Sequence, residues 1–236
     1  MSLLLKGGTV FLNGGFQNMD LAIDQGRSVS SSLPTEGFSV IELHNHLIVP
    51  GFVDVHVHLR EPGFSYKETI FSGTAAAAAG GYTAVCSMPN LKPVPDDAAN
   101  LQVQLDLIRK NARVHVYPYG AITRGEKGEE LADLAEMAPD VAGFSDDGRG
   151  VQSREMMRQA MLLAKSLDKP IVAHSEDESL LTKGWPSTTG NLPDGTASPA
   201  TTPPASGSRW SGTFSWCGRP AAGITSATSP PRSPWP

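Results

Sequence analysis

Residues 50–64 read PGFVDVHVHLREPGF, and this stretch decides how the chain folds. Valine at every second position alternates with Asp54, His56 and His58, which is the period-two pattern of a β-strand. The alternation sends His56 and His58 out of one face, about 7 Å apart at the backbone, where two imidazoles can bind one metal ion, most commonly zinc. Arg60 follows on that face or just beyond the strand end, and its guanidinium suits a carboxylate. The strand therefore predicts a metal site with an anion site beside it.

Composition limits the classes of protein that the chain can belong to. It has 236 residues and a formal net charge of −5, which disfavours a nucleic-acid partner or an anionic membrane surface. Its two cysteines make no disulfide framework, and no apolar run reaches the roughly 18 residues of a membrane helix. The N-terminus lacks the cleavage region of a signal peptide. We expect a soluble cytoplasmic protein.

Residues 1–49 are predicted to form a small β region. Glycine-rich turn signals, Gly7-Gly8 among them, separate its short strands, and the polar residues 28–32 interrupt the pattern. The strands are expected at residues 3–5, 9–11, 21–23, 38–43 and 47–49.

Four residues that could be mistaken for functional ones are given structural roles. His44 and His46 form a second HxH, but no arginine follows them, so we expect exposed strand residues. His115 lies within a strand without polar neighbours, and Cys86 is expected to be a small buried hydrophobe.

From residue 50 to 184, strands alternate with helices. Such alternation predicts an α/β fold with a parallel sheet, here a TIM-like (β/α)8 barrel of which about five strands are present. After the first strand, the expected strands are residues 83–87, 114–122, 141–144 and 170–174. The expected helices are residues 67–79, 96 or 97 to 111, 126–137 and 153–167.

Polar side chains stand where these strands end. In chain order they are His56, His58 and Arg60, then Asn90, then Asp146 and Asp147, and finally His174. Active sites of (β/α) barrels lie at the carboxyl ends of the strands, so these residues predict a hydrolytic site with one or two metal ions. An ordinary turn at residues 146–148 and a core histidine at position 174 are the alternatives.

Residues 185–236 differ from everything before them. Proline, serine, threonine and glycine dominate, all four tryptophans occur here, and neither the strand period nor the helix period is present. We expect a disordered or frameshifted tail.

Four segments together resemble the dihydroorotases of the amidohydrolase superfamily, in particular the bacterial class I type. They are PGFVDVHVHLREPG at 50–63, SMPN at 87–90, GFSDDG at 143–148 and VAHSED at 172–177. The N-terminal LLLKGGTVF is similar to the family's composite β-sandwich, so the resemblance covers residues 1 to about 184. Hydantoinases and allantoinases share HxH but usually lack Arg60 and Asn90 at these places.

The resemblance implies a zinc ligand set. His56 and His58 would bind a first Zn²⁺, Asp147 would bridge to a second ion, and His174 would bind that second ion. The family uses the second Asp of GFSDDG for this, so Asp147 is chosen over Asp146.

The resemblance also implies the substrate. His58, Arg60 and Asn90 would bind it, with Arg60 and Asn90 holding the carboxylate of dihydroorotate. The implied reaction interconverts N-carbamoyl-L-aspartate and dihydroorotate in de novo pyrimidine (UMP) biosynthesis, for which paired zinc ions would activate water and polarise the cyclic amide.

The sequence departs from the family after His174. Family members continue through three more barrel strands, which add another zinc-binding histidine and an acid/base aspartate, and neither is present here. We therefore assign no catalytic acid/base residue and expect a truncated, inactive barrel. Two other functions stay open: another cyclic amidohydrolase, such as an allantoinase or hydantoinase, or a non-catalytic dihydroorotase-like partner of aspartate transcarbamoylase. The partners considered are a second copy of the chain and that transcarbamoylase.

Overall fold

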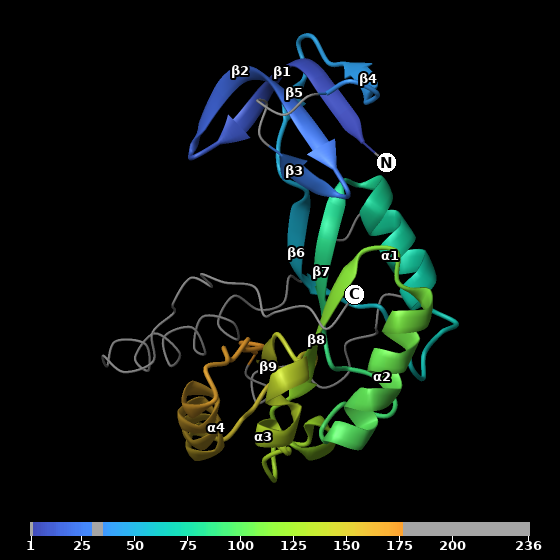
Figure 1. Cartoon of the computed structure of the whole chain (residues 1–236). Coiled ribbons are helices and arrows are strands. Elements are labelled where there is room, and N and C mark those ends of the chain that lie inside the picture. The colour runs from blue at the N-terminus through green and yellow to red at the C-terminus, as the bar shows by residue number, and fades with distance from the viewer. Residues whose placement is uncertain (1, 30–34, 177–236) are drawn as a thin grey trace, which may run out of the picture. The chain divides into compact units, whose positions relative to one another are not determined.

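The computed structural model describes residues 2–29 and 35–176 (Figure 1). The chain divides into two compact units, Met1–Phe52 and Val53–Pro236, each of which is treated by itself. The tail predicted over residues 185–236 lies outside the described ranges, as does most of the break predicted at residues 28–32. Within the described ranges, no helix combines the length and apolar character needed to cross a membrane.

The first unit is a single β-sheet built around one long hairpin. Strand β1 pairs antiparallel with β2 and parallel with both β4 and β5, while β2 pairs antiparallel with β3. The strands are β1 (Leu3–Leu12), β2 (Gly15–Asp24), β3 (Arg27–Val29), β4 (Ser39–Glu42) and β5 (Leu47–Ile48).

Two details of this sheet correct the prediction. Gly7-Gly8 does not end a strand, because β1 continues through it with a register shift between Leu5 and Gly8. Gly7 has φ +73°, a conformation that glycine adopts at no steric cost, so the pair forms an irregularity within one strand. His44 and His46 are exposed, as predicted, but they lie in the connection between β4 and β5 and not in a strand.

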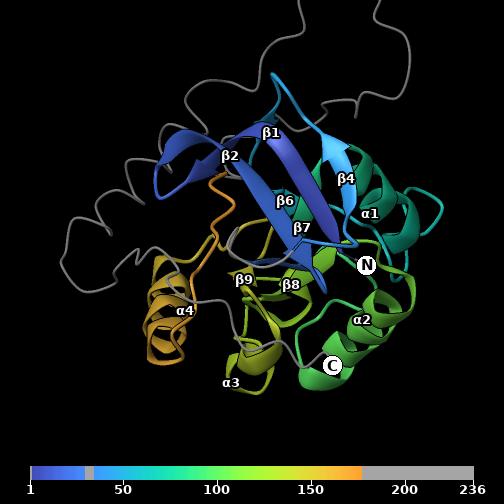
Figure 2. The same cartoon turned by 45° about the horizontal axis from the view of Figure 1, so that its top comes forward.

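The second unit is an open, partial (β/α) barrel (Figure 2). Its sheet has the order β6-β7-β8-β9, and the β7/β8 and β8/β9 pairs are parallel. The predicted α/β architecture is therefore confirmed. The strands are β6 (Phe52–Val57), β7 (Tyr82–Ser87), β8 (His115–Ala121) and β9 (Gly143–Ser145), and the longer helices are α1 (Ile70–Ala79), α2 (Ala98–Asn111) and α4 (Arg154–Ser166).

Polar caps fix where the longer helices begin. Asp97 accepts a hydrogen bond from the Asn100 N–H at 2.7 Å and starts α2, and Ser153 accepts one from the Met156 N–H at 3.3 Å and starts α4. Both starts agree with the sequence prediction. Each cap satisfies one of the backbone donors that the first helical turn leaves without a partner.

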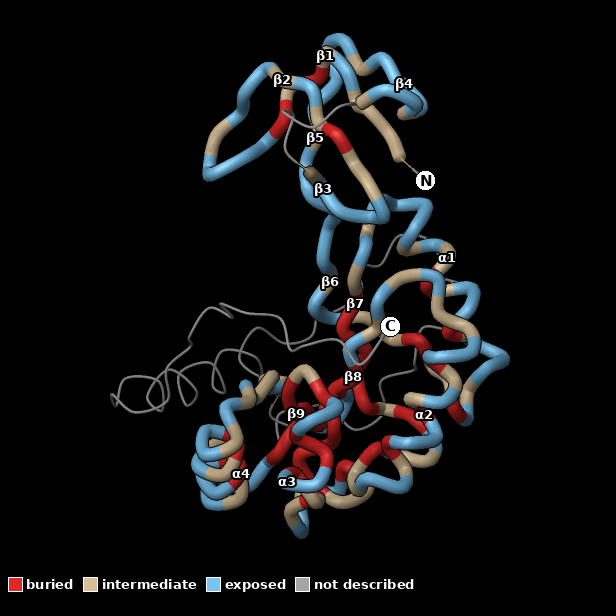
Figure 3. The backbone as a smooth tube through the Cα atoms, in the orientation of Figure 1, coloured by how far each residue is buried: buried red, intermediate tan, exposed pale blue. Residues whose placement is uncertain are grey.

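In the second unit, buried residues gather along β8 and β9 and in the segments next to them (Figure 3). Phe144 of β9 is fully buried, and it belongs to a cluster with Ile122, Met137 and Ala160. Burying large apolar side chains here holds the strand ends that carry the polar residues described below.

Two predicted elements differ from the structure, one in kind and one in extent. Residues 126–137 do not form one helix. The segment contains the 3₁₀ turn η1 (Arg124–Glu126), an irregular stretch and the short helix α3 (Leu134–Met137), which the 3₁₀ turn η2 (Ala138–Asp140) follows. Gly125 and Gly128 both have positive φ, which helical continuation does not allow. The strand predicted at 170–174 is an extended segment with one isolated bridge, Phe144 to Ile171.

The contribution of the Asp97 cap to the stability of the fold can be tested directly. Asp97→Ala should lower the free energy of unfolding by about 1 kcal/mol, because the Asn100 N–H loses its acceptor. Asp97→Ser should retain most of that stability, since serine is an equally good cap. Denaturant unfolding of both variants measures the difference, and equal stabilities would show that the cap does not contribute.

Candidate metal centre

The end of β6 places two imidazoles side by side. His56 lies in the strand and His58 one residue beyond its end, and their ring centroids are 5.3 Å apart. The sequence prediction that these two rings share one side is therefore confirmed.

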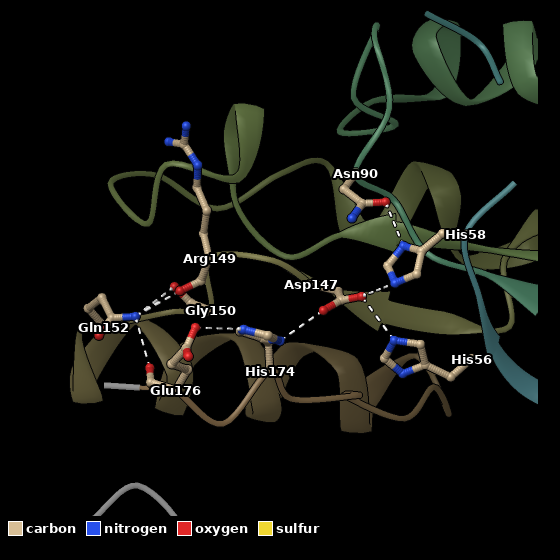
Figure 4. A network of polar contacts seen from close by, with 9 residues as sticks. All are labelled: His56, His58, Asn90, Asp147, Arg149, Gly150, Gln152, His174 and Glu176. Atoms are coloured by element: carbon tan, nitrogen blue, oxygen red, sulfur yellow. Dashed lines mark hydrogen bonds and ion pairs between the residues drawn. The ribbon is translucent and has the colours of Figure 1, made fainter. Parts of the chain in front are cut away.

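Asp147 is the residue on which the histidines converge (Figure 4). It follows β9, and its side chain is only 6% exposed. Its Oδ2 lies 3.0 Å from Nε2 of His56 and 3.2 Å from Nε2 of His58, while its Oδ1 lies 2.8 Å from Nδ1 of His174. One carboxylate therefore faces three imidazoles, two on one oxygen and one on the other.

This donor set fits a divalent metal ion. One ligand atom each from His56, His58 and Asp147 lie within 4.8 Å of one another. Imidazole nitrogen and carboxylate oxygen are the ligands that zinc and similar metals take. His174 is not one of this group of three, and its Nδ1 faces the second carboxylate oxygen of Asp147.

The protonation of the group follows from these contacts. The hydrogen bond from His174 holds the pKa of Asp147 below its ordinary value although burial acts to raise it, and the nearby His58 and His56 add to the lowering. The same hydrogen bond raises the pKa of His174, and Glu176 contributes through its Oε2, 3.3 Å from His174 Nε2. Asp147 is thus kept as an anion at neutral pH, the form in which a carboxylate binds a cation.

Asn90 orients one of the imidazoles. Its Oδ1 lies 3.0 Å from Nδ1 of His58 and can accept the proton on that nitrogen. The lone pair of a neutral His58 is then on Nε2, which is the nitrogen that faces Asp147. Asn90 therefore sets the tautomer that metal binding requires.

Asp146 faces the opposite way. Its Oδ1 accepts hydrogen bonds from the N–H groups of Ile122 (2.7 Å) and Thr123 (3.1 Å), and Oδ2 accepts from the Thr123 hydroxyl. Burial raises its pKa and outweighs these bonds. The two neighbouring aspartates thus have different partners: Asp146 holds the loop after β8, and Asp147 contacts the histidines.

Arg60 lies beyond the end of β6 and lines a cavity of about 220 Å³ with Asn90. It has φ +58°, the left-handed region that side-chain-bearing residues rarely adopt. Other residues of the lining are Phe64, Lys67, Leu91 and Glu126.

Sequence reasoning missed Glu126 and Glu176. Glu126 was expected to begin a helix, although it follows the carboxyl end of the third barrel strand, β8. A search for polar residues at that strand end, as at the others, would have found it. Cys86 is buried, as predicted, and His115 is an exposed residue at the start of β8.

The fold is similar to that of two solved hydantoinases. One is a D-hydantoinase (TM-score 0.63, 22% identity), and another is the L-hydantoinase from Arthrobacter aurescens (TM-score 0.61, 19% identity). These matches cover 76% and 75% of this chain and 41% of each of those chains. Fold and site together define a partial (β/α) barrel with a histidine–carboxylate centre at the carboxyl ends of its strands.

The particular family follows from the sequence comparison. The family model described as Dihydro-orotase-like matches residues 45–193, and the chain belongs to this family. It is 45% identical over 184 residues to the dihydroorotase of Fusobacterium nucleatum and 47% identical over 186 residues to that of Staphylococcus aureus. Each match covers 77% of this chain but only 43% and 44% of those relatives, so the chain spans less than half their length.

Gly150 tests how tightly the segment that carries His174 is held. A Cβ at Gly150 would lie 2.6 Å from the His174 carbonyl oxygen, and Gly150 has φ +69°. Gly128 has φ +75° with nothing within 4 Å of such a Cβ, so it is the matched control. Gly128→Ala should cost about 1 kcal/mol from backbone strain alone, and Gly150→Ala at least about 1 kcal/mol more from the close contact. Equal losses in denaturant unfolding would mean that residue 174 is not fixed against residue 150.

Proposed function

We propose that this chain carries the metal-binding and carboxylate-binding residues of a dihydroorotase, a zinc-dependent hydrolase of a cyclic amide. The observation that carries the proposal is the Asp147 carboxylate, which contacts His56 and His58 through one oxygen and His174 through the other. The ligand set and the kinship to dihydroorotases support the same chemistry.

His56, His58 and Asp147 would hold one zinc ion, and Asp147 and His174 would contribute to a second. When bound, zinc supplies positive charge that lowers the pKa of water and polarises an amide carbonyl. Asn90 and Glu176 orient the imidazoles through their outer nitrogens, which is the usual role of residues behind metal ligands.

Arg60 and Asn90 would hold the substrate's carboxylate in the cavity that they line. The amide nitrogen of Asn90 remains for this, because its oxygen faces His58. Hydrolysis adds water across the ring amide of dihydroorotate: oxygen joins the carbonyl carbon, a proton joins the nitrogen, and N-carbamoyl-L-aspartate results. Fixing the carboxylate would hold that ring bond at a set distance from Asp147. The free energy of binding the carboxylate would thus serve to orient the amide for reaction.

The reaction would serve pyrimidine biosynthesis in the cytoplasm, where a chain without a disulfide framework is stable. Among cyclic-amide substrates, the pairing of Arg60 with Asn90 favours one that carries a carboxylate. The shared Asp147 disfavours a purely non-catalytic partner, because such a protein has no need of a metal ligand set.

Metal content tests the first part of the proposal. The chain should bind Zn²⁺, and the double variant His56→Ala/His58→Ala should lose at least one ion per chain. His44→Ala/His46→Ala removes the other HxH and is the matched control, which should keep its metal. Plasma mass spectrometry after dialysis gives the count, and an unchanged count in the first double variant would refute the site.

Ligand binding tests the second part. Arg60→Met should weaken the binding of dihydroorotate to zinc-loaded protein by about 2–5 kcal/mol, because a desolvated carboxylate would lose its charged partner. Arg109→Met, on the exposed face of α2 beside Asp106, should leave the affinity unchanged. Isothermal calorimetry measures both, and an affinity that Arg60→Met does not alter would remove Arg60 from the site.

A further inference from the structure

Glu126 is the one acid among the six residues that line the cavity beside the metal centre. Its neighbours in this lining include two cations, Arg60 and Lys67, and the amide of Asn90. The proposed carboxylate site uses Arg60 and Asn90 and leaves Glu126 without a role.

Glu126 is buried without full hydrogen bonding. Its residue exposure is 8%, and among the described residues its buried Oε1 has no hydrogen-bond partner. A buried oxygen in that state costs stability, and native proteins seldom retain one without a reason. An apolar side chain of similar size would serve the fold better, which points to a role in binding.

The backbone at this position is also unusual. Glu126 has φ +55° and follows Gly125 at φ +57°. Of the six described non-glycine residues with positive φ, four lie in strand-connecting turns or at a helix end, namely Asn13, Gln25, Asn45 and Asp168. The other two are Arg60 and Glu126, and both line this cavity. Backbone conformations of this kind persist where the surroundings enforce them and cluster at functional sites.

The loop around Glu126 is held from two sides. Asp146 accepts hydrogen bonds from Thr123, and Thr123 Oγ1 in turn accepts one from the Gly128 N–H at 2.9 Å. Asp96 Oδ2 accepts one from the Gly125 N–H at 2.8 Å. The side chain of Glu126 is therefore presented by a preorganised loop, which lowers the entropy cost of binding a ligand.

The charge state of Glu126 suits a neutral polar partner. Burial, and then the nearby Asp146 and Asp147, raise the pKa of Glu126 to about 8. Asp96 adds to this rise and Arg149 opposes it. A carboxyl group that keeps its proton offers one O–H donor and one acceptor oxygen side by side. An amide or ureide edge, with N–H next to C=O, is the complementary shape.

We propose that Glu126 is a further substrate-binding residue, which hydrogen-bonds the ureide N–H/C=O edge of the ligand whose carboxylate Arg60 and Asn90 hold. The inference rests on the proposed function. In dihydroorotate that edge begins at the atom next to the carbon that bears the carboxylate. Glu126 lines the same cavity as Arg60, so it is placed to contact this ureide edge when Arg60 holds the carboxylate.

Two variants of similar size separate binding from folding. Glu126→Gln keeps a donor and an acceptor, and Glu126→Met keeps the volume without either. Dihydroorotate binding to the zinc-loaded full chain is measured by calorimetry, and stability by thermal unfolding without ligand. Glu129→Ala, exposed in the same loop, is the control.

Glu126→Met should raise the Kd of dihydroorotate about 10- to 100-fold, while Glu126→Gln and Glu129→Ala stay within about threefold of the unaltered chain. The melting temperature of Glu126→Met should equal or exceed that of the unaltered chain, because the substitution removes the buried oxygen that lacks a partner among the described residues. Unchanged affinity in Glu126→Met, or affinity and stability lost together, would overturn the inference and assign Glu126 a structural role. Absence of dihydroorotate binding by the unaltered chain would instead refute the proposed function, and the inference with it.

Discussion

A single buried carboxylate is the constraint on which the site depends. Asp147 has almost no contact with solvent, yet its two oxygens face His56, His58 and His174 at 2.8–3.2 Å. A buried charge must be compensated, and here the histidines provide the compensation, two from the end of β6 and one from the segment after α4. The carboxylate oxygens, together with imidazole nitrogens that carry no proton, can bind a metal ion. The fold brings these groups together because the carboxyl ends of parallel strands meet at one edge.

Residues next to this centre adopt arrangements that lower the stability of the fold but fix where their side chains lie. Asp146 uses both oxygens to hold the loop after β8. In that loop Glu126 is buried with a left-handed backbone, and its Oε1 has no hydrogen-bond partner within residues 2–29 and 35–176. Arg60, which lines the same cavity, shows the same backbone feature. A sequence selected for folding alone would avoid both features, so their joint presence at one cavity supports the proposal that a ligand binds there.

The two-residue period of the strands and the polar caps of the helices made much of the second unit predictable from sequence. The valine alternation located β6 and paired His56 with His58, and Asp97 and Ser153 located two helix starts. The failures have physical causes. Residues 126–137 have helical composition, but Gly125, Gly128 and the side-chain bonds of Asp96 and Asp146 enforce a loop. Glu126 was missed because it was assigned to the start of a helix and was not counted among the polar residues that follow the strand ends.

The most direct test of the central claim is X-ray absorption at the zinc edge of the metal-loaded chain. If Asp147 and its histidines form the centre, the spectrum should contain imidazole multiple scattering from two or more histidines, with nitrogen or oxygen ligands at about 2.0–2.1 Å. In Asp147→Asn the imidazole contribution should fall or the zinc should be lost. A zinc shell made only of oxygen ligands, or one unchanged in Asp147→Asn, would contradict the account.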